Sequence, residues 1–130
     1  MESEQIIIDK ICSAFTIQDA PSDEWILSNP YIFEEISVSQ AISYLPAYMI
    51  FVLRNMRNDP QSVVYMQLLF TLNEYSKCKD PDNLDLGLWF LLNKSQKHAV
   101  MAFLGHILHN QHANIDEEEL RIIINRWKDT

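Results

Sequence analysis

The sequence predicts an all-α fold, a single compact bundle of about six helices over residues 1–130 with a proline-kinked central helix. Apolar residues recur at helical spacing in five segments, and polar residues that favour helix starts stand before them. The chain has only two glycines, and no stretch alternates apolar and polar residues as a strand would. Its 130 residues, 48% of them hydrophobic, are enough to build one core.

Each of the five clearest helices is predicted from its own apolar face. The least regular part is the segment "TIQDAPSDEWILSNP", residues 16–30, and "RIIIN" near the end is assigned to a helix because an acidic start precedes it. The five faces are, in chain order, Ile7, Ile8, Ile11 and Phe15; Val38, Ile42, Leu45, Met49, Val52 and Met56; Val64, Leu68, Leu69, Leu72 and Tyr75; Val100, Phe103, Leu104, Ile107 and Leu108; and Leu120, Ile123, Ile124 and Trp127.

Helix starts are marked by two kinds of signal. An N-cap residue followed by proline, which fits the first helical turn, occurs at Asn29-Pro30, Asp59-Pro60 and Asp80-Pro81. Capping-box spacing, in which a cap residue is followed three positions later by Glu or Gln, occurs at Ser37 and Gln40, Asn93 and Gln96, and Asn114 and Glu117.

Pro46 stands inside the central helix, where it removes the amide that would bond to the Ile42 carbonyl at a cost of about 3 kcal/mol. Both flanks keep one apolar period, so packing is expected to hold the helix across a kink. A second apolar set, which includes Tyr44 and Tyr48, makes this helix apolar nearly all round, as expected of a central one. An alternative is a small pocket lined by Tyr44, Pro46 and Tyr48.

The segment "SQAISYLPAYMIFVL" resembles the signature of a small bacterial family of helical proteins without assigned chemistry, whose members carry a "YYLPAYL" helix and a later "L…Q..A…FL..L" helix. The segment "FEEI", residues 33–36, resembles the acidic stretch before the first motif, although a tryptophan-containing stretch expected between them is missing. The resemblance implies a helical fold, a bacterial source and a small stand-alone cytoplasmic protein. The matching positions are Tyr44, Leu45, Pro46, Ala47, Tyr48 and Met49, then Leu92, Gln96, Ala99, Val100, Phe103 and Leu104.

The net charge of -8 is concentrated near the N-terminus, because residues 1–35 hold eight acidic residues against Lys10 alone. Such a chain is repelled by phosphate backbones, so direct nucleic-acid binding is not expected. The acidity either aids solubility or attracts a basic protein.

Motifs for catalysis, phosphate binding and metal binding are lacking. No P-loop or GxGxxG is present, the start of the chain does not resemble a signal peptide, and no apolar run is long enough to cross a bilayer. We expect a cytoplasmic protein with no cofactor, no metal and no membrane contact. His98, His106, His109 and His112 are interpreted as a polar helix face, because their spacing lacks the four ligands of a structural zinc motif. Cys12 and Cys78 are expected to be reduced thiols.

The leading hypothesis is a non-enzymatic protein-binding domain, most concretely an immunity-type inhibitor that neutralises a basic, nuclease-like toxin. Small acidic proteins of this size are common among immunity proteins, which is an argument by analogy. The predicted partner-binding residues are Asp23, Glu24, Glu34 and Glu35, with Trp25 as the anchor. Alternatives are a small-ligand or enzymatic domain that uses the pocket beside Pro46, and a homo-oligomeric structural protein.

Overall fold

A computed structural model describes residues 4–17, 20–56, 62–77, 91–110 and 117–128. In this part of the chain it contains seven α-helices and no strand, which confirms the all-α prediction. None of the helices it describes is long and apolar enough to cross a membrane. The helices are α1 (Glu4–Ala14), α2 (Asp23–Ser28), α3 (Ile32–Glu35), α4 (Val38–Asn55), α5 (Val63–Lys77), α6 (Lys94–Asn110) and α7 (Glu117–Trp127).

The described residues form seven helices where the sequence predicts about six, and one short helix, α2, lies in the stretch that the sequence marks as irregular. The hydroxyl of Ser22 caps α2 by accepting a hydrogen bond from the amide of Trp25 at 3.1 Å. Two carboxylates, Asp23 and Glu24, occupy its first turn, where they are favourably placed against the helix dipole. A cap and an acidic first turn therefore stabilise a helix too short to show an apolar period.

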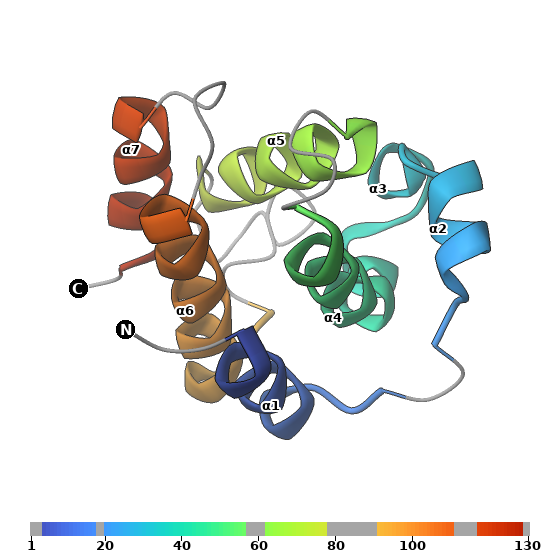
Figure 1. Ribbon diagram of the computed structural model, residues 1–130, viewed down its shortest axis with the longest axis horizontal. Coiled ribbons are helices and arrows are strands. Elements are labelled where there is room, and N and C mark those ends of the chain that lie inside the picture. Colours follow the sequence, from blue (N-terminus) through green and yellow to red (C-terminus); the bar gives the residue numbers. More distant parts are fainter. Residues whose placement is uncertain (1–3, 18–19, 57–61, 78–90, 111–116, 129–130) are drawn as a thin grey trace.

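α4 lies in the middle of the molecule (Figure 1). α5 crosses above it, α1 and α6 lie side by side below and to the left, α7 packs on α5 and α6, and α2 and α3 lie to the right. The apolar faces of these helices meet in one core. A central helix must be apolar on several sides, and α4 buries nine residues in total.

The predicted apolar faces are the buried ones. Every residue of the faces on α1 and α5 is buried, and the faces on α4, α6 and α7 are buried except for Val38, Ile42, Leu108 and Ile124, which are half-buried against the core. Trp127 is completely buried, and its indole Nε1 donates a hydrogen bond to the Leu72 carbonyl at 2.9 Å. This bond fastens the last helix to α5.

The capping predictions are confirmed at two sites and wrong at one. Ser37 and Gln40 form a reciprocal capping box at the start of α4, and Asn93 and Gln96 exchange the same two bonds at the start of α6. Asn29 does not begin α3 but ends α2, because its side-chain Nδ2 donates to the Trp25 carbonyl at 2.9 Å. The predicted starts at Asp59, Asp80 and Asn114 lie outside the described residues.

Pro46 lies within α4, which continues through it from Val38 to Asn55, and its side chain is buried. The surrounding residues Leu45, Tyr48 and Met49 are each at most 1% exposed. Packing on all sides therefore supports a helix that lacks one of its own hydrogen bonds. The predicted kink at this position stays a prediction.

Candidate functional site

The four carboxylates predicted to contact a partner lie on α2 and α3. Asp23, Glu24, Glu34 and Glu35 are all exposed, and none forms an ion pair with another residue that the structure describes. The chain from residue 11 to residue 53 contains no Lys, Arg or His. These four carboxylates define the α2–α3 surface. Its negative charge is not neutralised by basic residues nearby in the sequence.

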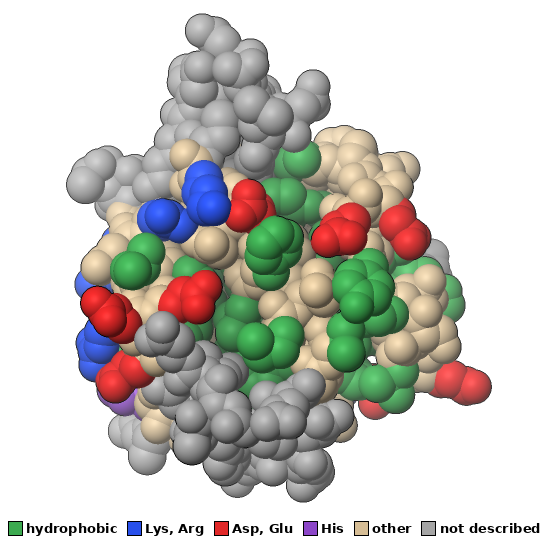
Figure 2. Space-filling model, turned by 90° about the horizontal axis from the view of Figure 1, so that it is seen from above, with side chains coloured by type: hydrophobic (Ala, Val, Ile, Leu, Met, Phe, Trp, Pro, Cys, Tyr) green, Lys and Arg blue, Asp and Glu red, His purple; other side chains and the backbone are tan. Residues whose placement is uncertain are grey.

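The space-filling view shows how the charges are separated. On one face of the molecule, acidic side chains lie on the right, where Figure 1 places α2 and α3, and no Lys or Arg of the described residues is visible there (Figure 2). Lys and Arg side chains lie on the left of this face, together with further acidic ones, where Figure 1 places α7. The right-hand end of this face is therefore the acidic one.

The α2–α3 surface is held in place by aromatic contacts with α4. Phe33 packs edge-on against Tyr48 with ring centroids 5.0 Å apart, and the ring of Trp25 stacks on Tyr44 at 5.6 Å. The Tyr48 hydroxyl donates a hydrogen bond of 2.6 Å to the carbonyl of Asn29, the residue that ends α2. These contacts give short helices, which have little stability of their own, a fixed position.

The predicted anchor, Trp25, is half-buried because one face of its indole is covered by Tyr44. Its role as a partner contact stays a prediction. Its stacking on Tyr44 also gives it a structural role. Two apolar side chains near the carboxylates are more exposed: Leu27 at 59% and Tyr31 at 46%. Sequence reasoning missed both. No sequence signal separates Leu27 from its neighbour Ile26, because a six-residue helix is too short to show an apolar period.

The three pocket candidates of the sequence, Tyr44, Pro46 and Tyr48, lie on α4 in different environments. Pro46 and Tyr48 are buried, whereas Tyr44 is half-buried under Trp25. Burial raises the pKa of the Tyr48 phenol above its ordinary value, and the nearby Tyr44 and Glu35 raise it further. This phenol therefore acts as a hydrogen-bond donor to Asn29.

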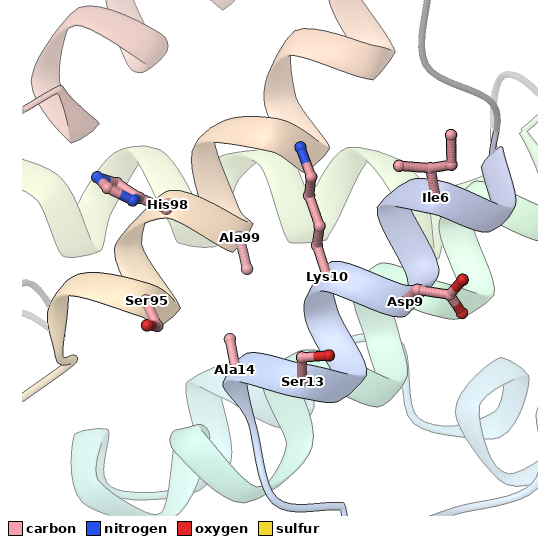
Figure 3. Close-up of a pocket in the computed structure, with 8 residues that line it drawn as sticks. All are labelled: Ile6, Asp9, Lys10, Ser13, Ala14, Ser95, His98 and Ala99. Atoms are coloured by element: carbon pink, nitrogen blue, oxygen red, sulfur yellow. The ribbon is translucent and has the colours of Figure 1, made fainter.

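The predicted pocket beside Pro46 stays a prediction. A groove of about 520 Å³ lies between α1 and α6 (Figure 3). Ala14 and Ala99 face each other across it, and Lys10 extends between the two helices. Asp9 points away from α6, and His98 points away from α1, so these two polar side chains do not meet. The Asp9 carboxylate accepts a hydrogen bond of 2.9 Å from Gln5. The groove thus has no acid–base pair aimed at a common point. Its residues are Ile6, Asp9, Lys10, Ser13, Ala14, Ser95, His98 and Ala99.

The described histidines on α6 do not share one polar face. His98 and His109 are exposed, but His106 is only 8% exposed, so its predicted place on a polar face is wrong. His106 falls between Phe103 and Ile107 on the buried side of the helix, which its three-residue distance from His109 did not reveal. In the described ranges, no three His, Cys, Asp or Glu side chains are placed to hold a metal ion. His112 and Cys78 lie outside these ranges, and Cys12 is an exposed free thiol.

No protein-family model matches the chain, and comparison with curated proteins and with solved structures finds no match. The resemblance of the Pro46 segment to a bacterial helical family therefore stays a prediction.

Proposed function

We propose that this chain is a non-enzymatic protein-binding domain, and most concretely an immunity-type inhibitor that binds and neutralises a basic, nuclease-like toxin in the cytoplasm of a bacterium. The observation that supports this proposal is the α2–α3 surface. It presents four exposed carboxylates without a described ion-pair partner, in a stretch of 43 residues that contains no basic side chain.

The chemistry of such a contact follows from charge. A nuclease presents a positive groove to its substrate, and carboxylates held on fixed helices imitate the phosphates that the groove binds. Long-range attraction speeds the encounter, while apolar side chains that become buried supply most of the affinity. Leu27 and Tyr31 are exposed beside the carboxylates and can supply that apolar contact, together with the free face of Trp25.

The test is co-expression of this chain with a toxin-like domain encoded beside it. The two proteins should co-purify, and the growth arrest that the toxin causes should be relieved. Neutralising the α2–α3 surface should slow association by roughly tenfold at low salt, with the difference shrinking as salt rises. The fold should survive, because carboxylates at helix starts contribute only about 0.3–1 kcal/mol each. The variant carries Asp23→Asn, Glu24→Gln, Glu34→Gln and Glu35→Gln.

A matched control neutralises four exposed carboxylates elsewhere and so changes the net charge equally. It should reduce the association rate much less, because its charges lie on α1 and α7. Equal rates for the two variants would show that net charge alone matters and would place the interface elsewhere. Failure to protect against any neighbouring toxin-like domain would contradict the proposed function. The control carries Asp9→Asn, Glu117→Gln, Glu118→Gln and Glu119→Gln.

A further inference from the structure

The α2–α3 arm, residues 23–35, packs on the rest of the molecule through few contacts. Figure 1 shows α2 and α3 together at one side of the molecule, beside α4. The extensive contacts between described helices are those among α1, α4, α5, α6 and α7, and none of them involves α2 or α3. The arm buries the apolar side chains of Ile26, Ile32 and Phe33, whereas α4 alone buries nine residues. Displacing the arm therefore disturbs a small part of the core.

Asn29 joins the two helices of the arm. It ends α2, because its amide donates to the Ile26 carbonyl at 3.0 Å and its side chain donates to the Trp25 carbonyl at 2.9 Å. The Asn29 carbonyl accepts a hydrogen bond of 3.3 Å from the amide of Ile32, the first residue of α3. Consecutive hydrogen bonds through one residue make α2 and α3 move together.

Two tyrosines of α4 hold the arm. The Tyr48 hydroxyl donates to the Asn29 carbonyl at 2.6 Å, where α2 and α3 meet, and the Tyr48 ring contacts Phe33 edge-on. One turn earlier in α4, Tyr44 stacks on Trp25 with the two ring planes 11° apart. In the part of the chain that the structure describes, the bond between Tyr48 and Asn29 is the single hydrogen bond that joins the arm to another helix.

We propose that the α2–α3 arm opens from α4 as one unit while α1, α4, α5, α6 and α7 stay folded, and that the Tyr48 hydroxyl holds it closed. Opening breaks one hydrogen bond and two ring contacts, and it leaves the contacts among the five longer helices in place. Segments with few buried contacts open at a lower free energy than the core.

Opening changes two surfaces at once. It moves the four carboxylates of the α2–α3 surface away from α4 together, because all four lie on the arm. It also uncovers the rings of Tyr44 and Tyr48, which the arm covers in the closed form. The opening needs no partner, so this inference stands independently of the proposed function.

The experiment is native-state hydrogen exchange of the whole chain, followed by NMR at several low urea concentrations. The hydrogen-bonded amides of Ile26, Asn29 and Glu34 report on the arm. They should share one opening free energy, with protection factors at least about a hundredfold lower than those of interior amides in α4 and α6. Their exchange should depend less steeply on urea, because opening of the arm exposes little surface.

Two results of this experiment would overturn the proposal. Equal protection and equal urea dependence in the arm and in α4 would show that the arm opens only when the whole molecule unfolds. Different opening free energies for the amides of Ile26 and Glu34 would show that α2 and α3 open separately.

Tyr48→Phe tests the residue that holds the arm. It removes the hydroxyl, retains the ring beside Phe33, and should lower the protection of the arm amides about tenfold. Tyr65→Phe is the matched control, because it removes the same atom from a buried ring without a hydrogen-bond partner among the described residues. The control should leave the arm amides unchanged even if it stabilises the molecule as a whole. Arm protection that Tyr48→Phe leaves unchanged, or that both variants lower equally, would contradict the role of Tyr48.

Discussion

Two buried tyrosines give a sharp test of the structure, because they differ in one interaction. Tyr48 and Tyr65 are 1% and 2% exposed. The Tyr48 hydroxyl donates to the Asn29 carbonyl at 2.6 Å, but the Tyr65 hydroxyl is buried with no hydrogen-bond partner among the described residues. Changing each residue to phenylalanine removes the same oxygen atom from two similarly buried rings.

Only the Tyr48 change is expected to destabilise the fold. Tyr48→Phe removes a hydrogen bond and leaves the Asn29 carbonyl without its donor, so the free energy of unfolding should fall by about 1–2 kcal/mol. Tyr65→Phe removes a buried polar group that pays a desolvation cost of about 1–3 kcal/mol without compensation. The Tyr65 variant should therefore be as stable as the native chain or up to about 2 kcal/mol more stable.

The assay is urea denaturation followed by far-ultraviolet circular dichroism, with the two variants and the native chain measured together. In a thermal melt of a chain of this length, the same free-energy loss in Tyr48→Phe should lower the melting temperature by about 4–8 °C. Equal losses in both variants would refute the reasoning, because they would show that the two hydroxyls have equivalent environments. A larger loss in Tyr65→Phe than in Tyr48→Phe would refute it more strongly.

The remaining predictions concern the proline, metal binding and pH. Pro46→Ala should keep the helical circular dichroism and change the unfolding free energy by no more than about 2 kcal/mol in either direction, because a restored hydrogen bond opposes a lost packing contact; global unfolding would show that the ring itself is required. Treatment with EDTA should not shift the melting temperature, and elemental analysis of protein made without a His-tag should find less than one zinc per chain; one tightly bound zinc would contradict the interpretation of the histidines. Burial raises the pKa of Tyr48, Tyr65 and Tyr75 above the ordinary value near 10. Their contribution to stability is therefore complete below pH about 10 and is lost as the pH rises further, because the unfolded chain releases these protons first. Urea midpoints at pH 8 and pH 11 measure this loss, which should be smaller in Tyr65→Phe; an equal loss would assign the alkaline sensitivity to other groups.

The candidate interface was only partly predictable from the sequence. Four carboxylates on the surface are expected from their charge alone, and Asp23, Glu24, Glu34 and Glu35 are exposed. The half-burial of Trp25 was not predictable, because the Tyr44 ring that covers it lies 19 positions away in the chain. Sequence reasoning accordingly missed Leu27 and Tyr31, which are more exposed than an aromatic anchor that already has a partner.

The sequence by itself determined the five longer helices, α1, α4, α5, α6 and α7. Apolar residues at steps of three and four fix which side of a helix can be buried, and the caps at Ser37 and Asn93 fix where two of the helices begin. Both signals act between residues at most a few positions apart, so they operate whatever the rest of the chain does. Asn29 shows where such local signals fail, because the same side chain can begin one helix or end another.

Only the tertiary structure decided which apolar side chains are buried where a helix is apolar on more than one side. α5 is apolar on two sides, and the packing of α4 and α7 determines that Val64, Leu68 and Leu72 are buried while Val63, Met66 and Phe70 are left exposed. The position of α2 beside α4 gives the Tyr48 hydroxyl the carbonyl of Asn29, whereas the Tyr65 hydroxyl on α5 has no partner among the described residues. A helical period records which residues share a side, but burial and hydrogen-bond partners depend on contacts between segments far apart in the chain, which no local pattern contains.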